Sequence, residues 1–142
     1  MVRIVILLVM YLVSQIIEAQ TTNSSNEEFD RGVNEYVTIN VTVPKVSGNE
    51  GVVLFALYNS NEKFMKRETM ATKEGEIKNG AVTVSFHKVA SGTYAIVCLH
   101  DKNGNKRMDF NENGMPVEDY GISNNVMLMG PPNFEEAKFA VG

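Results

Sequence analysis

Short segments in which apolar and polar residues alternate recur along this chain, and they restrict its fold more than any other feature. In YVTINVTVP, apolar residues from Val37 to Val43 take every second place until Pro44 ends the run. A period of two puts those side chains on one face of a β-strand. AVTVSFHKV, at residues 81–89, repeats the pattern and predicts a second half-buried strand with Val82, Val84 and Phe86 inward.

Other segments extend the strand pattern. VVLFALYN, residues 52–59, is apolar on both faces and predicts a central strand. TYAIVCLHD, residues 93–101, predicts another core strand, and EAKFAVG a short closing strand with Phe139 and Val141 inward. Only SNEKFMKRE, residues 60–68, suggests one or two helical turns. The expected fold class is all-β: a single antiparallel β-sandwich of about seven strands, immunoglobulin-like in outline, with one long polar loop.

The first residues have the composition of a targeting segment. Arg3 precedes an apolar run from Ile4 to Val13, and IEA offers a cleavage point after Ala19. Such a run is too short to span a bilayer, so a secretory signal peptide is favoured over an uncleaved anchor. The expected division is a signal peptide at 1–19, a flexible polar leader at 20–34 and a β-sandwich domain at 35–142.

The charge and the cysteine content of the chain limit its possible partners and its covalent cross-links. The chain has 142 residues, a net charge of −4 and no basic cluster, which argues against nucleic acid as a partner. Its one cysteine, Cys98, excludes an intramolecular disulfide and reads as a small buried hydrophobe rather than a reactive thiol. Together with the predicted signal peptide, these features lead us to expect an exported protein, which is periplasmic, outer-surface or secreted. We expect an envelope or extracellular partner and no membrane span after signal cleavage.

The stretch HDKNGNKRMDFNENGMPVEDYGISNN follows the predicted core strand and carries the strongest chemical signal. Counted from Asp101, oxygen-bearing residues fall at places one, three, five, nine and twelve, and place seven offers a backbone carbonyl. This is the ligand spacing of an EF-hand calcium loop, in which alternate residues aim oxygens at one centre. The predicted metal ligands are Asp101, Asn103, Asn105, Arg107, Asp109 and Glu112.

The same stretch departs from the EF-hand in two ways. Place six is normally glycine and here is Lys106, and no helix flanks the loop. The alternative is a solvated turn, because Asn, Asp and Gly favour turns on their own. If the loop binds Ca²⁺, its three carboxylates predict a modest dissociation constant of ~10⁻⁴ to 10⁻³ M. Candidates for second-shell or loop support are His100, Glu118, Tyr120 and Asn124.

The motifs SGTYAIVCLHDKNGNKRMDFNENGMPVEDYGISNN and GPPNFEEAKFAV resemble an exported bacterial family, domain of unknown function 2141. The likeness covers roughly Tyr36 to Val141. It implies an exported β-sandwich, similar in outline to prealbumin-like modules, and it carries no assigned activity. The family's usual glycine in the loop is Lys106 here.

The sequence allows three classes of function to be compared: an enzyme, a calcium-binding module and a ligand-binding domain without metal. Only two histidines occur, and neither stands in a nucleophile motif, so we expect no enzyme. A prealbumin-like hydrolase is disfavoured, because the chain ends in FAVG rather than the YRGS of those enzymes. The expected function is a non-catalytic module with a calcium-binding loop and a binding or structural role. The alternative is a small-ligand or glycan-binding domain without metal.

Overall fold

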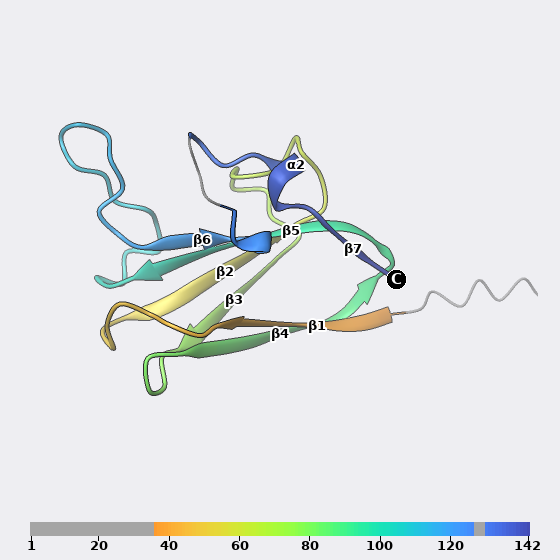
Figure 1. Ribbon diagram of the computed structural model, residues 1–142, viewed down its shortest axis with the longest axis horizontal. Helices are drawn as coiled ribbons and strands as arrows, with labels where there is room; N and C mark the ends of the chain where they lie inside the picture. The colour runs from red at the N-terminus through yellow and green to blue at the C-terminus, as the bar shows by residue number, and fades with distance from the viewer. Residues whose placement is uncertain (1–35, 127–129) are drawn as a thin grey trace, which may run out of the picture. The chain divides into compact units, whose positions relative to one another are not determined.

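A computed structural model describes residues 36–126 and 130–142, so the predicted signal peptide and leader lie outside the described residues. This part of the chain contains seven strands, one 3₁₀ turn and one short α-helix (Figure 1). Their bounds are β1 Tyr36–Val43, β2 Val52–Tyr58, β3 Ala71–Glu76, β4 Val82–Ala90, β5 Gly92–Asp101, β6 Tyr120–Ile122, η1 Ser123–Asn125, α2 Phe134–Ala137 and β7 Phe139–Val141.

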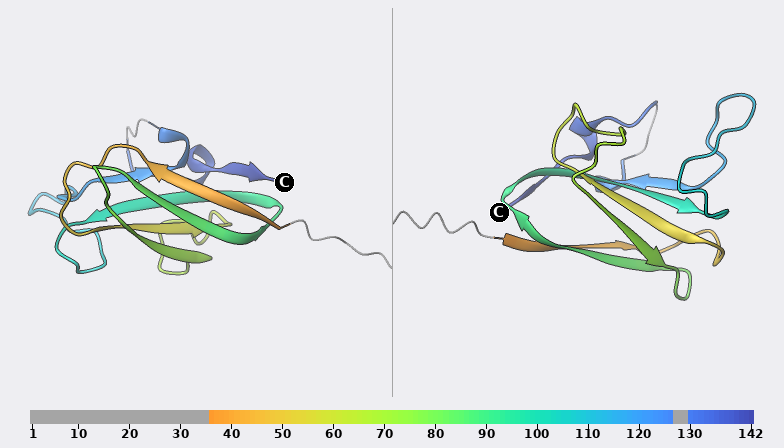
Figure 2. Two further views of the ribbon diagram at one scale, coloured as in Figure 1. Left: turned by 90° about the horizontal axis from the view of Figure 1, so that it is seen from below. Right: turned by 180° about the vertical axis from the view of Figure 1, so that it is seen from behind.

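The strands form two antiparallel sheets. β1 pairs with β4 in the smaller sheet, and the larger sheet has the order β3-β2-β5-β6. β7 pairs with the first residues of β5, on the edge that β6 occupies further along (Figure 2). The prediction of an all-β sandwich with about seven strands is confirmed.

The core lies between the two sheets. Val53, Phe55 and Leu57 of β2 face Val84 and Phe86 of β4, and all five side chains are buried. The apolar residues of β1 pack against this cluster from the same side as β4. The predicted inward faces of the alternating strands are therefore confirmed, as is the central position of β2 between β3 and β5.

The outer face of the larger sheet is covered at one end only. Tyr58, Phe64, Ala95, Phe134 and Ala137 form a second cluster there, with the Phe64 ring packed edge-on against the rings of Tyr58 and Phe134. These contacts bring α2 and the segment after β2 onto the sheet. No other element of the described residues packs on the rest of this outer face, and its side chains are only half-buried.

The helical turns predicted at residues 60–68 are wrong. The segment forms successive turns, and Met65 has a left-handed φ of 60° and is 49% exposed. Phe64 packs inward as expected. A single buried aromatic ring anchors the segment without the repeated apolar contacts that hold a helix on a sheet.

In the described residues, no helix has the length and apolar character needed to cross a membrane.

Candidate metal centre

The candidate centre begins where β5 ends, at Asp101. This residue pairs with Val52 in the sheet, and its side chain is 0% exposed. Its Oδ1 accepts the backbone N–H of Gly104 at 2.8 Å and of Asn105 at 3.1 Å, and its Oδ2 accepts that of Lys106 at 2.9 Å. A carboxylate fixed by the sheet thus organises the chain that follows it.

Two asparagines and Asp109 converge beside this carboxylate. The Nδ2 atoms of Asn103 and Asn105 each lie 2.7 Å from Oδ2 of Asp109. The Oδ1 of Asn103 accepts the N–H of Asn105, and the Oδ1 of Asn105 accepts that of Arg107. These consecutive side chain–backbone bonds curl the loop so that alternate side chains face one point.

The backbone turns left-handed at the sixth place of the loop. Lys106 has a φ of 58°, although it is not glycine, and Gly104 has a φ of 76°. A left-handed backbone is where an EF-hand loop normally has its glycine. Lys106 therefore adopts the expected loop conformation at a steric cost that glycine would avoid.

A third carboxylate reaches the loop from further along the chain. The N–H of Val117 bonds to the carbonyl of Asp109 at 3.0 Å, so residues 110–117 leave the loop and return to it as an arm (Figure 1). Glu118 follows the arm and is only 7% exposed. Its Oε1 accepts the N–H of Lys102 at 3.1 Å, and its Oε2 accepts that of Asp109 at 3.4 Å.

Glu112, the predicted ligand at place twelve, is not brought to the other candidates. It lies exposed in the turn at the tip of the arm, where Oδ1 of Asn111 accepts the N–H groups of Asn113 and Met115. The EF-hand count assumes a loop that ends at place twelve. Here the arm extends the loop, and Glu118 occupies the returning position.

Arg107 occupies the seventh place, where the backbone carbonyl is the expected ligand. Its side chain points outward and is 77% exposed, with Nε 3.7 Å from Oδ1 of Asp109. The guanidinium therefore partly offsets the charge of Asp109 without entering the loop.

His100 supports the base of the loop from the inner side of β5. Its ring is 4% exposed, and Nε2 bonds to the carbonyl of Glu50 at 2.8 Å. Its Nδ1 lies 3.9 Å from Oδ2 of Asp119, and its backbone N–H bonds to the Asp119 carbonyl. The hydrogen bond from Ser47, followed by that from Lys102, lowers the pKa of Asp119 below its usual value. This network ties the β1–β2 connection to the loop base.

The remaining support candidates act elsewhere. Tyr120 pairs with Leu99 in the sheet, and its half-exposed ring stands at the outer face. The Nδ2 of Asn124 donates to the carbonyls of Glu136 and Lys138, both at 2.9 Å. Asn124 therefore holds α2 against the sheet and has no bond to the loop among the described residues.

The loop offers hard oxygen donors, and among the described residues only one of its three carboxylates, that of Asp109, has a cationic partner, Arg107. Within residues 36–126 and 130–142, neither Asp101 nor Glu118 forms an ion pair. In that same part of the chain, no three His, Cys, Asp or Glu side chains gather as a metal cluster, and the candidate set mixes carboxylates with amides. Such a set suits a hard cation such as Ca²⁺ rather than a transition metal.

An all-β sandwich with a structured polar loop at one strand end is the class that this geometry defines. The chain belongs to the bacterial family called domain of unknown function 2141, described as an uncharacterized protein conserved in bacteria, whose profile matches residues 41–142. The match covers the larger sheet, β4, the last residues of β1 and the whole candidate centre. No curated protein and no solved structure matches the chain.

Proposed function

We propose that this protein is an exported, non-catalytic β-sandwich module whose loop from Asp101 to Glu118 binds calcium. The observation that carries the proposal is the pair of buried carboxylates, Asp101 and Glu118, which face the same loop and have no cation in the described residues. Backbone N–H groups donate to both carboxylates, but a buried charge remains costly unless it is also paired or coordinates a metal. A divalent ion between them would supply the missing charge.

The proposed ligands differ from the EF-hand count at one place. The predicted ligands that are retained are the side chains of Asp101, Asn103, Asn105 and Asp109 and the carbonyl of residue 107. Glu118 replaces Glu112 as the last ligand. Calcium binds six to eight oxygens, which this set can provide together with water. Rotation of the Asn103 and Asn105 amides would exchange nitrogen for oxygen beside Asp109, at the cost of their bonds to the backbone.

Modest affinity and a structural role follow from the same residues. Three carboxylates and a left-handed Lys106 favour a dissociation constant of ~10⁻⁴ to 10⁻³ M, suited to the calcium levels outside cells. At that affinity the ion would rigidify the loop in an exported protein. The loop and its arm would then present a defined surface to an envelope or extracellular partner.

The arrangement around His100 supports a non-catalytic role. Ser47 donates to Asp119, and the Nε2 of His100 bonds to a backbone carbonyl. A nucleophile would need a direct bond to the imidazole. His100 therefore connects the β1–β2 connection, through Glu50, to the end of the polar loop, through Asp119.

The test is a thermal melt of the protein in chelator, in ~10 mM calcium and in the same concentration of magnesium. Binding to the folded state alone raises stability by RT ln(1 + [L]/Kd), about 2.7 kcal/mol at a hundredfold excess. We expect a rise that is specific to calcium. Asp109→Ala should remove the rise, whereas Glu62→Ala, which removes an exposed acid outside the loop, should retain it.

Equal midpoints in calcium and chelator would contradict the proposal and return the loop to a solvated turn. Loss of the calcium response in Glu62→Ala as well as in Asp109→Ala would contradict the site, since it would indicate a response to overall charge.

A further inference from the structure

The open part of the larger sheet's outer face forms a groove of about 670 Å³. Its floor is aliphatic and half-buried: Leu54 and Ala56 of β2, and Val97 and Leu99 of β5. Their neighbours on the strands face the core, so this row is the second apolar face of the two central strands. We call this hollow the outer-face groove.

Two segments far apart in sequence form the walls of the outer-face groove. One is the turn region after β2, which contributes Met65, Arg67 and Thr69. The other is the middle of the polar loop, Lys106–Met108, with Tyr120 of β6 beside it. Methionine side chains adapt to irregular apolar ligands, so the two thioethers suit a flexible chain above the floor.

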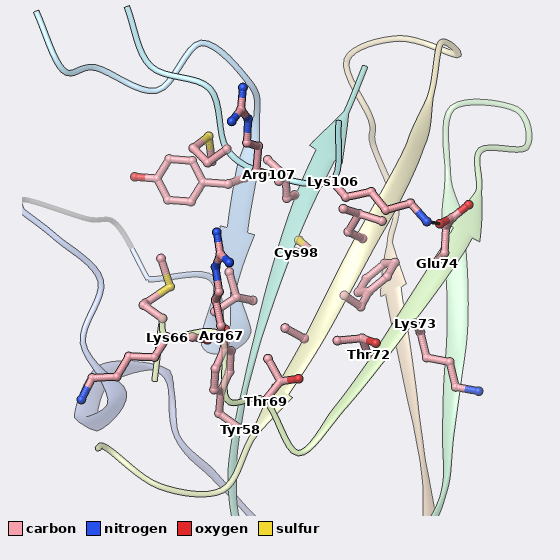
Figure 3. A pocket seen from close by; sticks show the side chains of 18 residues that line it. Tyr58, Lys66, Arg67, Thr69, Thr72, Lys73, Glu74, Cys98, Lys106 and Arg107 are labelled. Atoms are coloured by element: carbon pink, nitrogen blue, oxygen red, sulfur yellow. Dashed lines mark hydrogen bonds and ion pairs between the residues drawn. The ribbon is translucent and has the colours of Figure 1, made fainter. Parts of the chain in front are cut away.

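The charge of the walls is opposite to that of the whole protein. In Figure 3, Arg67 extends along the groove, whereas Arg107, Lys66 and Lys73 point away from it. Lys106 is paired with Glu74, at 3.5 Å between Nζ and Oε2, and Arg107 is paired with Asp109, at 3.7 Å between Nε and Oδ1. Arg67 has no ion pair in the described residues. A cationic site on a chain of net charge −4 requires an explanation.

We propose that the outer-face groove binds an amphipathic anion, a long-chain carboxylate. The alkyl chain lies on the aliphatic floor, and the carboxylate binds the guanidinium of Arg67. An arginine offers a carboxylate two parallel N–H donors, which fixes the head group while the chain is held by burial. The volume is within the range of small-molecule pockets. The floor and Arg67, which carry the proposed contacts, lie outside the calcium loop, and only the wall at Lys106–Met108 belongs to it.

The test is calorimetric titration of the protein with dodecanoate below its micellar concentration. The titration is run in chelator, because calcium precipitates long-chain carboxylates, and its outcome is therefore separate from that of the calcium melt. We expect saturable binding of dodecanoate and none of acetate, which has the head without the chain. Dodecyltrimethylammonium, with the same chain and the opposite charge, should bind at least about tenfold more weakly, since it lacks the charge-assisted hydrogen bond.

Two variants test the two parts of the site. Arg67→Gln should weaken dodecanoate binding about tenfold, the scale of one charge-assisted hydrogen bond. Lys63→Gln is the matched control, since it removes the same charge from the same segment outside the groove, and it should bind like the parent. Leu99→Asn tests the floor and should also weaken binding, provided that its melt shows a folded protein.

Three results would overturn the proposal. They are the absence of saturable dodecanoate binding to the parent, equal affinity of Arg67→Gln and Lys63→Gln, and binding of hexaglutamate as tight as that of dodecanoate. The last result would assign the groove to an acidic peptide.

Discussion

The two halves of the polar segment after β5 look alike in sequence and behave differently in the fold. Each contains two Asn, one Gly and one acidic residue. In the first half, 102–109, the backbone wraps around the buried carboxylate of Asp101. In the second, 110–117, the chain closes on Asn111 and exposes Phe110 and Met115 by 61% and 62%.

The difference comes from the anchor. Asp101 is the last residue of a paired core strand, so the sheet holds its carboxylate in place before the loop forms around it. Asn111 has no such support and organises only the turn to which it belongs. A run of turn-forming residues therefore becomes a candidate binding site where rigid structure holds its first ligand.

The largest expected effect separates the two anchors directly. Asp101→Ala should lower the free energy of unfolding by roughly 2–4 kcal/mol in chelator, because three backbone N–H groups lose their acceptor beside a buried site. Asn111→Ala in the arm should cost less than about 1 kcal/mol, because water can replace its bonds. Urea unfolding measures both. Equal losses would mean that the two turns are equivalent.

A second comparison sets Glu118 against Glu112. In calcium at a hundredfold excess over Kd, the parent should gain about 2.7 kcal/mol over chelator. Glu118→Gln should lose most of this gain, whereas Glu112→Gln should keep it, since Glu112 lies at the exposed tip of the arm. Thermal or urea unfolding with and without calcium decides between them. The reverse pattern would show that the arm folds back on the ion and that the EF-hand count was right.

A third comparison uses the left-handed residues of the two halves. Lys106→Gly should stabilise the protein by about 0.5–1 kcal/mol, because glycine adopts the φ of 58° without strain. Gly114→Ala in the arm should destabilise the protein by a similar amount, because the φ of 74° is strained for alanine. The added Cβ would meet open space, so backbone strain is the whole effect. Both are read from urea midpoints. A destabilised Lys106→Gly would mean that the Lys106–Glu74 ion pair outweighs the strain.

The smallest expected effect is a pH dependence at the loop base. Because the pKa of Asp119 is lowered in the folded state, its stabilising contribution is complete above the unfolded value of about 3.9 and is lost as the pH falls through the folded pKa. Ser47→Ala removes the largest cause, so it should cost less than about 1 kcal/mol at pH 7 and little below that window. Urea unfolding of parent and variant across the acid range measures it, and a difference that persisted at low pH would contradict this assignment.

Strand number and faces followed from the sequence because burial on one face repeats every second residue. β1 and β4 were predicted from this alternation, β2 and β5 from runs that are apolar on both faces, and β7 from the inward places of Phe139 and Val141. β3, with the sequence ATKEGE, carries no such signal, since it is an edge strand exposed along most of its length. β6 is three residues long and is defined only by its pairing with β5.

The sequence by itself determined the class of the fold and the candidate loop, since strand periodicity and the Asp-x-Asn-x-Asn spacing are local properties. Only the tertiary structure decided which carboxylate returns to the loop, because the arm between Asp109 and Glu118 breaks the linear count. It also decided the role of Asn124, which bonds to α2. The outer-face groove likewise exists only in the fold, where residues from the turn after β2, β5 and the polar loop meet. Contacts between distant segments depend on how the chain closes, and no local pattern encodes that.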